Sequence, residues 1–463
     1  MVEIDDIHSH LNRTEVARIV RPTTVGEARD AVLTAAREGL AVGICGGRHA
    51  MGGQQFAAAG LLIDASGLDR VIAFDPIAGT IAVEAGIQWP ALVAWLRAHQ
   101  PGDAGWGIVQ KQTGADRLSI GGALSANIHG RGLALRPIVQ DIAAFTLIDA
   151  AGVVRRCSRS EEPELFALAI GGYGLFGIIA TVTLRLSRRR RMRRLVAVTN
   201  VDQLMKSFDA RIAAGCVYGD FQFMTDERSP NFLREGVFSC YEPVGDDTPV
   251  SAGHVELDEA DWRRLYRLAH EDRAELYRVY RAFYESTHGQ VYWSDLHQLS
   301  VYIDGYHREL DAGRATARSE MISELYVPRL ALPAFLAEVA EDFRRHRVEL
   351  IYGTVRLVER DDETVLAWAR SDWACTVMNL CVTHDERGIA KAAEDFRRLI
   401  DAARRHGGSY FLTYHRWATR EQAEACHPRL RECLAEKRRI DPGGRFQSDW
   451  YRHHLALLGM EAL

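Results

Sequence analysis

Short apolar runs alternate with amphipathic stretches along the first 190 residues of the chain. Residues 40–45 and 61–64 are largely apolar runs bounded by glycine or polar turn residues, which predicts two buried strands. Residues 25–38 repeat apolar positions with helical spacing, and Thr24 suits the N-cap and Gly39 the stop. Strands and helices are therefore expected to follow one another closely here.

Hairpins interrupt this alternation. Residues 71–74 and 80–83 have strand patterns and are joined by residues 75–79, which are rich in turn formers. A helix is predicted next, with Pro90 in its first turn and apolar spacing through Leu96. The mixture of hairpins and helices favours an α+β class over a regular, parallel, doubly wound sheet.

The middle of the chain differs in composition. Residues 187–195 form an arginine block, which usually indicates a solvated strand or linker, with a phosphate-bearing substrate as the sharper interpretation. Beyond it, residues 220–223 and 236–241 have strand patterns, and residues 261–286 are helical and rich in Arg and Tyr. Four aromatic residues follow that either belong to the core or form a wall for a sugar ring: Tyr292, Trp293, Tyr302 and Tyr306.

Three glycine-rich stretches stand out against this background. Residues 46–55, GGRHAMGGQQ, follow a predicted strand, so the backbone can approach an anionic ligand closely, with His49 in mid-loop. Residues 119–132, SIGGALSANIHGRG, place small residues where a flat ligand would lie against the backbone. Residues 164–186, ELFALAIGGYGLFGIIATVTLRL, end in a strand pattern. Tight helix–sheet packing explains each of the first two stretches alone equally well, but together the stretches favour a bound cofactor.

Length and composition narrow the class of protein. A chain of 463 residues exceeds one compact core and indicates about two domains. The hydrophobic fraction of 47%, the charged fraction of 26% and the net charge of −5 do not favour a nucleic acid or a membrane surface as partner. No apolar run reaches membrane-spanning length, and the first twenty residues lack the apolar core of a signal peptide.

Cysteine usage indicates the cellular compartment. The eight cysteines are scattered, without CxxC spacing and without a metal-like cluster with histidines. This usage is typical of a reducing environment. We therefore expect a cytoplasmic enzyme or binding protein without a metal site.

The glycine-rich stretches also carry a resemblance to a known family. The chain resembles the vanillyl-alcohol oxidase family, whose FAD-binding domain is also called the p-cresol methylhydroxylase (PCMH) type. Three motifs match that family in order and spacing: a loop with GGxH, then SxGGAxxxxxHG, and then GGxGxFGIIxxVTLRL. Residues 437–446, KRRIDPGGRF, resemble the closing KxxxDPxxxF of that family. The resemblance implies an α+β fold with a two-part PCMH-type FAD-binding domain and a mixed α/β cap domain for the substrate. The implied segments are 1–190 for FAD, 191–405 for the cap and 406–463 returning to the FAD-binding domain.

FAD is thus the implied cofactor. In this family a histidine at the position of His49 often bonds covalently to the 8α-methyl group of the flavin, a reaction that suits a neutral imidazole nitrogen. Residues 110–116 lack the cysteine that makes a second link in some relatives, so one link is expected, although Ala50 replaces the usual serine. The residues expected around FAD are Gly46, Gly47, Arg48, His49, Ala50, Gln54, Thr113, Ser119, Gly121, Gly122, Ala126, Asn127, His129, Gly172, Gly177, Ile178 and Ile179.

Later segments resemble the branch of aldonolactone and alditol oxidases, decaprenylphosphoryl-ribose oxidase and sterol double-bond reductases. Residues 324–329 match E-x-[FY]-x-P-R, which precedes a helix in these cap domains. Residues 352–358 resemble a strand that carries a Glu-x-Arg pair beside the substrate, with Arg356 as the arginine and Thr354 in place of the glutamate. In the following strand, Asn379 stands where a histidine would be.

Residues 410–417 lie where these relatives carry an active-site lysine. On a strand, Tyr414 and His415 would point to opposite faces. Tyr414 occupies the lysine position of the ribose-oxidising relatives and is expected to face the flavin, with His415 as the alternative base. His129 is expected to order a loop near the flavin, Arg356 to act electrostatically and Asn379 to orient the substrate. The expected catalytic set is Tyr414, His415, Arg356, Asn379 and Glu324.

The resemblance implies oxidation of a CH–OH group in a sugar, polyol, lactone or similar metabolite, by hydride transfer to flavin N5. The expected partners are a small-molecule substrate and O2 or another electron acceptor. Two alternatives stay open. A reductase of a carbon–carbon double bond, as in the sterol-reducing relatives, would use NADPH, and a non-catalytic flavin-binding protein would explain the absent Glu, His and Lys.

Overall fold

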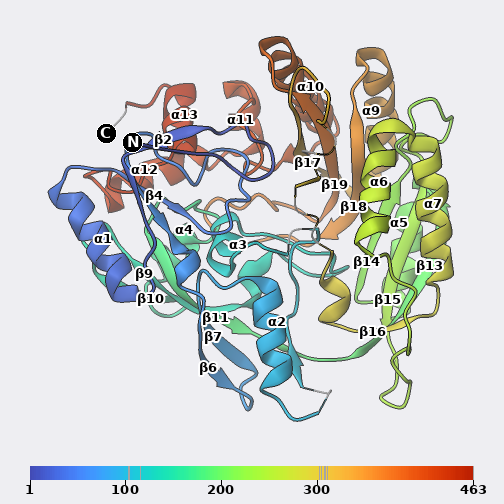
Figure 1. Cartoon of the computed structure of the whole chain (residues 1–463), viewed down its shortest axis with the longest axis horizontal. Helices are drawn as coiled ribbons and strands as arrows, with labels where there is room; N and C mark the ends of the chain where they lie inside the picture. The colour runs from blue at the N-terminus through green and yellow to red at the C-terminus, as the bar shows by residue number, and fades with distance from the viewer. Residues whose placement is uncertain are drawn as a thin grey trace.

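The structure is a computed structural model. It describes residues 1–102, 105–114, 116–301, 303, 305–306, 309 and 311–461, so Tyr302 of the predicted aromatic set lies outside it. Figure 1 shows the N-terminal part, in blue and cyan, on the left and the middle of the chain, in green and yellow, on the right. The C-terminal helices, in red, lie above the N-terminal part.

A small parallel sheet lies near the N-terminus. Its order is β3 (Arg18–Val20), β5 (Leu61–Asp64), β4 (Val42–Cys45), and an antiparallel pair of β1 (Val2–Ile4) and β2 (Thr14–Val16) precedes it. Helix α1 (Val25–Arg37) begins at Thr24, whose side chain accepts a hydrogen bond from the Glu27 amide, and Gly39 follows its end with φ of +70°. The predicted strands and helix are confirmed.

An antiparallel sheet adjoins it. Its order is β10 (Val154–Ser158), β9 (Ile142–Ile148), β11 (Ile178–Arg185), β7 (Thr80–Glu84), β6 (Val71–Asp75), which confirms the predicted β6–β7 hairpin. The helices of this region are α2 (Trp89–Ala98), α3 (Ile120–Ala126) and α4 (Pro163–Ala169). Two short strands, β8 (Trp106–Gly107) and β12 (Ser187–Arg188), pair where the chain leaves it. The hairpins beside a parallel sheet confirm the α+β class.

The middle of the chain forms an eight-stranded sheet in which all neighbouring strands among the described residues pair antiparallel. Its order is β16 (Val291–Trp293), β13 (Arg191–Asn200), β15 (Glu235–Pro243), β14 (Tyr218–Phe223), β18 (Leu350–Val358), β19 (Trp373–Thr383), β17 (Arg318–Pro328), β20 (Ser409–Tyr410). Arg356 lies opposite Cys375, and Glu324 lies opposite Val377, so alternate residues of β17, β18 and β19 share one face. That face carries Glu324, Arg356 and Asn379 of the predicted catalytic set.

Helices flank the eight-stranded sheet. Helix α9 (Leu332–His346) contacts both α5 (Val201–Ala213) and α10 (Glu386–Arg405). Helix α6 (Glu259–Glu271) contacts α7 (Arg273–Ser286). The single helical stretch predicted for residues 261–286 is therefore two helices. Asp272 separates them, because its backbone leaves the helical region and its side chain caps α7 by accepting from the Glu275 amide.

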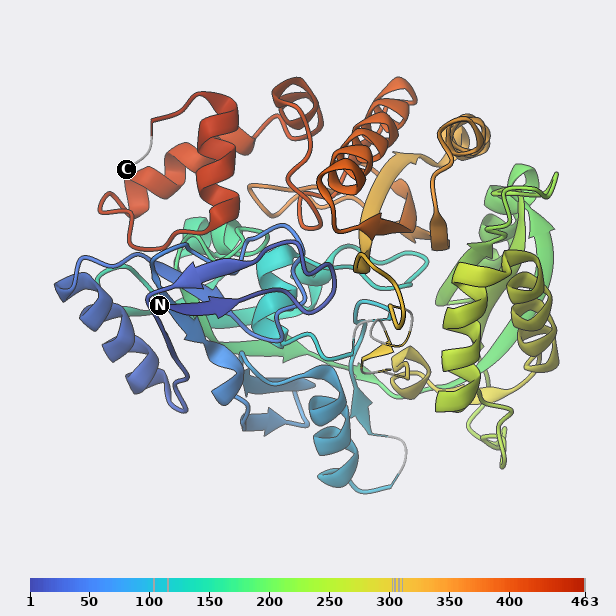
Figure 2. The ribbon, with the colours of Figure 1, turned by 45° about the horizontal axis from the view of Figure 1, so that its top comes forward.

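The C-terminal segment, with α11 (Arg420–Cys426), α12 (Leu430–Ile440) and α13 (Asp449–Leu458), returns to the first sheet (Figure 2). Phe446 forms a parallel bridge with Val42 of β4, and the Val42 amide donates to the Arg445 carbonyl at 2.7 Å. The turn before it depends on Asp441, which forms a buried ion pair with Lys437 and accepts from the Phe446 amide at 2.8 Å. The boundaries near residues 190 and 405 stay predictions.

The predicted strand over residues 410–417 is wrong. Strand β20 ends at Tyr410, and residues 411–418 form turns and irregular chain. Their carbonyls have other partners, because Gln54 Nε2 donates to the carbonyls of Leu412 and Thr413 at 3.3 and 2.8 Å. Among the described residues, no helix combines the length and apolar content needed to cross a bilayer.

Candidate functional site

A cavity of about 850 Å³ lies between the glycine-rich stretches and the eight-stranded sheet. Its size is that of a cofactor or small-molecule site. The predicted cofactor residues that line it are Gly46, Gly47, Arg48, His49, Ala50, Gln54, Thr113, Ser119, Gly121, Gly122, Ala126, His129, Gly177 and Ile179. The predicted catalytic residues that line it are Tyr414, Arg356, Asn379 and Glu324. The fold therefore brings both sets to one space.

Three predicted cofactor residues lie behind the cavity wall. Asn127 is fully buried and ends α3 with φ of +48°, while its side-chain amide donates to Asp361 at 2.9 Å. A Cβ on Gly172 would lie 2.2 Å from the Leu168 carbonyl, so this glycine serves chain packing. Ile178 is fully buried in β11. These residues support the wall and do not border the cavity.

His415 also lies away from the cavity. Its ring is 2% exposed and packs against Phe396, with ring centroids 4.5 Å apart, and against Tyr410. Burial, with a smaller contribution from Arg397, lowers the pKa of His415 to about 3. Of the two neighbours that the sequence left as alternatives, the structure turns Tyr414 toward the cavity.

Glycine lets the segments that line the cavity pack directly against neighbouring chain. A Cβ on Gly46 would lie 2.1 Å from Ser119 Oγ, and one on Gly121 would lie 2.8 Å from the Ala85 Cβ. Ser119 is the N-cap of α3 and accepts from the Gly122 amide at 3.3 Å. The two stretches are therefore in contact with each other and form one continuous surface of backbone.

Gly47→Ala is expected to destabilise the protein by about 1–3 kcal/mol, because the added Cβ would lie 2.4 Å from the Arg117 carbonyl oxygen. Urea unfolding followed by tryptophan fluorescence measures this loss. Gly443→Ala is the control, since a Cβ there meets no atom within 4 Å. Equal unfolding midpoints for the two variants would show that the loop accommodates a side chain.

One ring nitrogen of His49 has a hydrogen-bond partner among the described residues, and the other has none. Its Nδ1 lies 2.6 Å from Nε2 of His8, and its buried Nε2 has no hydrogen-bond partner among the described residues. Burial, followed by the charge of His8, lowers the pKa of His49 to about 3. The imidazole is therefore neutral, and the tautomer that donates Nδ1–H to His8 leaves a lone pair at Nε2.

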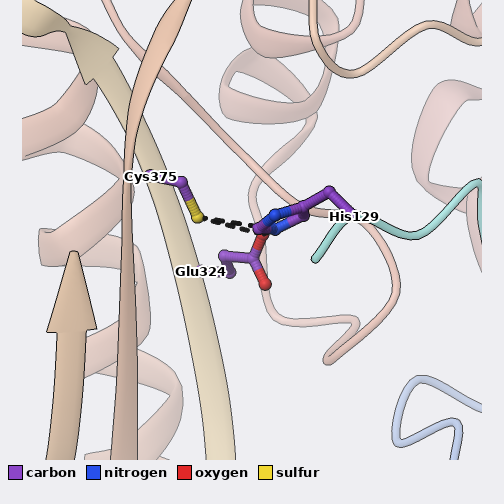
Figure 3. Close-up of side chains that lie close together, drawn as sticks. All are labelled: His129, Glu324 and Cys375. Carbon is purple, nitrogen blue, oxygen red and sulfur yellow. Dashed lines mark hydrogen bonds and ion pairs between the residues drawn. The ribbon is translucent and has the colours of Figure 1, made fainter. Parts of the chain in front are cut away.

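Glu324 is the centre of a hydrogen-bond network (Figure 3). Its Oε1 lies 2.7 Å from His129 Nε2 and accepts from Tyr326 OH at 2.6 Å and from Cys375 Sγ at 3.3 Å. Its Oε2 accepts from Tyr414 OH at 3.2 Å. Burial alone would raise the pKa of Glu324, but His129 and Tyr326 outweigh it and lower the pKa to about 2.

The position of one proton in this network follows from its partners. His129 Nδ1 lies 3.0 Å from the Gly130 carbonyl, which can only accept, so Nδ1 carries a hydrogen. Nε2 faces a carboxylate oxygen, and two acceptors cannot share that short distance without a hydrogen between them. His129 and Glu324 therefore hold one proton jointly, which makes His129 more than the loop-ordering residue expected from the sequence.

The ligand atoms of His129, Glu324 and Cys375 lie within 4.8 Å of one another, close enough to be candidate metal ligands. All three side chains are buried. Hydrogen bonding already explains the cluster, since His129, Tyr326, Cys375 and Tyr414 surround the two oxygens of Glu324. We therefore assign the cluster to hydrogen bonding.

Three polar residues complete the sheet side of the cavity. The Arg356 side chain is 6% exposed, and its Nε has no partner within the described part of the chain. Asn379 Nδ2 donates to Glu320, while its Oδ1 is unpartnered there. Burial, followed by Glu324, raises the pKa of Tyr414 well above its usual range, so this hydroxyl keeps its proton. A cation and two polar groups thus face the cavity beside an ionised carboxylate.

Several residues of the site were missed by the sequence analysis. Tyr326 had a usable signal, since it follows Glu324 by two positions and shares its strand face. Cys375 and His8 had none, because both reach their partners across large separations along the chain. His8 lies in a segment that carries no motif.

Residues 16–158 match the FAD binding domain family. Rice mitochondrial L-galactono-1,4-lactone dehydrogenase 1 is 27% identical over 208 residues, which cover 44% of this chain and 34% of the relative. Mouse L-gulonolactone oxidase is 30% identical over 166 residues, 36% of each chain. L-gulono-1,4-lactone dehydrogenase of Mycobacterium tuberculosis (strain CDC 1551 / Oshkosh) is 32% identical over 168 residues, 36% of this chain and 37% of the relative.

These similarities confirm the predicted resemblance to aldonolactone oxidases and to their FAD-binding part. The chain spans about a third of the length of the curated relatives it matches. The matched residues 16–158 include the first glycine loop and the SIGGALSANIHGRG stretch. Residues 16–158 are therefore similar to an FAD binding domain, and the third glycine stretch and the sheet with Glu324 follow them in the chain.

Proposed function

We propose that this protein is an FAD-dependent oxidoreductase that oxidises a CH–OH group of a sugar, polyol, lactone or similar hydroxylated metabolite. The observation that carries the proposal is the Glu324 network, which faces the same cavity as the glycine-rich cofactor loops. The similarity to lactone oxidases and dehydrogenases supports the substrate class.

The residues present fit FAD. The glycine contacts at Gly46, Gly47 and Gly121 leave no room for side chains, which suits a backbone that lies against a flat ring or a pyrophosphate. His49 Nε2 is buried without a partner at the same wall. We propose the two-part PCMH arrangement, in which residues 1–190 and 406–463 hold FAD and residues 191–405 cap it.

We also propose a single covalent link between His49 and the flavin. An imidazole is nucleophilic only while one ring nitrogen is unprotonated, and the low pKa keeps the His49 ring in that neutral form at any working pH. The His8 contact at 2.6 Å orients the ring and can hold the proton of Nδ1 when Nε2 reacts.

The cofactor and the protein each carry out one part of the proposed oxidation. FAD, when bound, supplies the acceptor for a hydride equivalent from carbon. Glu324 accepts the hydrogen bond of the substrate hydroxyl and takes its proton as the carbonyl forms, so that one C–H and one O–H bond break. His129, Tyr326 and Cys375 hold the carboxylate in place and keep it ionised.

Arg356 and Tyr414 act on the oxygen of the same group. A buried guanidinium with an unpartnered Nε stabilises the negative charge that develops on that oxygen. Tyr414 keeps its proton and donates a hydrogen bond to Glu324 Oε2 at 3.2 Å, and it can turn this hydrogen to the substrate oxygen once the substrate hydroxyl donates to Glu324. Asn379 orients a further hydroxyl through its unpartnered Oδ1.

The remaining parts of the proposal concern the acceptor and the compartment. The electrons leave the flavin for O2 or another acceptor. A cytoplasmic location is supported by the eight cysteines, each of which is a free thiol.

Anaerobic mixing of the flavin-loaded protein with a panel of sugars, polyols and lactones tests the activity. We expect at least one compound to bleach the oxidised flavin, with no NADPH present. Bleaching by NADPH and by none of these compounds would instead favour a double-bond reductase. Bleaching by neither would favour a non-catalytic flavin-binding protein.

His49→Ala is expected to abolish covalent attachment. The parent should retain the mass of one FAD after acid denaturation, by intact mass spectrometry, and the variant should release it. His346→Ala is the control, since that histidine is partly exposed at the end of α9. Flavin released from the parent would contradict the covalent link and leave FAD binding intact, whereas a colourless parent that takes up no added FAD would contradict FAD binding itself.

A further inference from the structure

One arginine of the predicted solvated block lines the cavity instead of facing solvent. Arg194 on β13 donates from Nε to Tyr241 OH at 2.9 Å and from Nη1 to Thr287 Oγ1 at 3.0 Å. Its guanidinium also lies over the rings of Tyr284 and Tyr292, 5.2 and 4.6 Å from their centroids. No carboxylate in the described part of the chain forms an ion pair with it. This charge is held in a cage of neutral side chains.

Arg131, from the second glycine stretch, lines the same cavity and lies beside Arg194. Its guanidinium is 4.9 Å from the Tyr241 centroid, and that of Arg194 is 5.3 Å from it. Arg131 is 8% exposed, its Nη1 is 3.7 Å from Asp220, and its Nε has no partner among the described residues. Two guanidinium groups therefore share one aromatic ring.

His297 adds a third donor. Arg131 Nη2 lies 3.1 Å from His297 Nδ1, and because arginine can only donate, Nδ1 must be the acceptor. The neutral ring then carries its hydrogen on Nε2, which is buried and unpartnered within the described ranges. Burial, followed by the charges of Arg131 and Arg194, lowers the pKa of His297 well below its usual range, in agreement with a neutral ring.

The charges around this group do not balance. Lys111 is the third cation that acts on His297, and it pairs with Asp116 at 2.6 Å. Asp116 and Asp220 are two carboxylates against three cations, which leaves one positive charge in excess. A buried positive charge without a counter-ion is costly, and an anionic ligand would remove that cost.

We propose that Arg131, Arg194 and His297 form an anion-binding subsite, and that the substrate carries a carboxylate or phosphate group there. The inference rests on the proposed function, because it assigns part of the substrate to the same cavity. Arg131 follows His129 by two residues of irregular chain, a separation of about 7 Å at most. Since His129 contacts Glu324, the backbone that carries Arg131 lies close to the proposed proton acceptor.

Calorimetric binding to the flavin-loaded protein, without oxygen and at pH 8, tests the subsite. Two matched pairs are compared, D-gluconate with D-glucitol and D-glucose 6-phosphate with D-glucose. We expect at least one anion to bind about 10- to 100-fold more tightly than its neutral partner, the gain of charge-assisted hydrogen bonds. A larger gain in the first pair identifies a carboxylate substrate, and a larger gain in the second identifies a phosphate.

Variants then locate the effect. Arg131→Gln and Arg194→Gln should each remove most of the gap between anion and neutral compound, and Arg194→Gln serves if the more buried Arg131 cannot be replaced without unfolding. Arg193→Gln is the matched control, since this neighbour on the same strand is exposed and faces Glu242 at 3.6 Å. The difference in affinity between the anion and its neutral partner should persist in Arg193→Gln.

Three results would overturn the subsite: equal binding within both pairs, binding of none of the four compounds, or a gap that survives in both arginine variants. Binding is read independently of turnover, so the two proposals can fail separately. An anion that binds as expected while no compound reduces the flavin would refute the oxidase function and leave the subsite in place.

Discussion

Glu324→Gln is expected to lower the rate of substrate-dependent flavin reduction by about 10²- to 10⁴-fold and to leave flavin binding unchanged. The amide has the shape of the carboxylate but cannot take a proton from a hydroxyl group. It can still satisfy its neighbours, because an amide donates to His129 Nε2 and the hydroxyl of Tyr326 can donate or accept. Stopped-flow absorbance without oxygen, with a compound that bleaches the parent, measures the rate.

The controls separate proton transfer from structure. Glu242→Gln removes a carboxylate of the same sheet that pairs with Arg193, and should keep the parental rate. The unfolding midpoint and the flavin content of Glu324→Gln should also match those of the parent. A rate within threefold of the parent would show that Glu324 is not the proton acceptor.

The hydrophobic and turn patterns of the sequence predicted those helices and strands whose stabilising partners lie close by along the chain. Residues 71–74 and 80–83 form a hairpin because the turn between them brings their partners together, and Thr24 caps α1 within its own first turn. The strand predicted over residues 410–417 failed for the opposite reason. Its apolar residues match a strand, but Gln54, far away in sequence, takes the carbonyls of Leu412 and Thr413.

The candidate site divides in the same way. Glycine spacing predicted the cofactor loops, because only glycine allows the close chain contacts found at Gly46 and Gly121, and glycine can be recognised in the sequence. The pairing of His129 with Glu324 spans 195 residues and depends on how β17 lies across the cavity. Single-sequence spacing carries no information on such a contact, and the arginine block likewise did not reveal that Arg194 turns inward while Arg193 turns outward.

The protein is expected to lose stability sharply between pH 7.5 and pH 5.5. Burial is the first cause that lowers the pKa of His415, His427 and His454 to about 3, with smaller contributions from Arg397, from Arg370 and from His453 respectively. Unfolding returns each ring to a pKa of about 6.5, so the unfolded chain takes up protons that the folded chain cannot. Stability is therefore complete above pH 6.5 and is lost progressively as the pH falls toward 3.

The size of the effect follows from the shifts. At pH 5.5 each ring contributes a loss of about 1.4 kcal/mol, so the three together remove about 4 kcal/mol from a total that is roughly 5–15 kcal/mol in proteins of ordinary stability. Urea unfolding at the two pH values measures the difference. His415→Phe should reduce the loss by about 1.4 kcal/mol, because phenylalanine fills the space between Phe396 and Tyr410 without a proton to gain.

The same comparison in His346→Gln should leave the loss unchanged, since the His346 side chain is 40% exposed and lies near Asp342 on the same helix. A loss below about 1 kcal/mol in the parent would mean that the three rings accept protons in the folded state. For His427 and His454 that would require their packing to open, because His427 lies against the ring of Tyr410 and His454 against the ring of Trp450. Arg370 adds a further positive charge near His427. The C-terminal segment that closes over β4 would then be the first part of the fold to yield to acid.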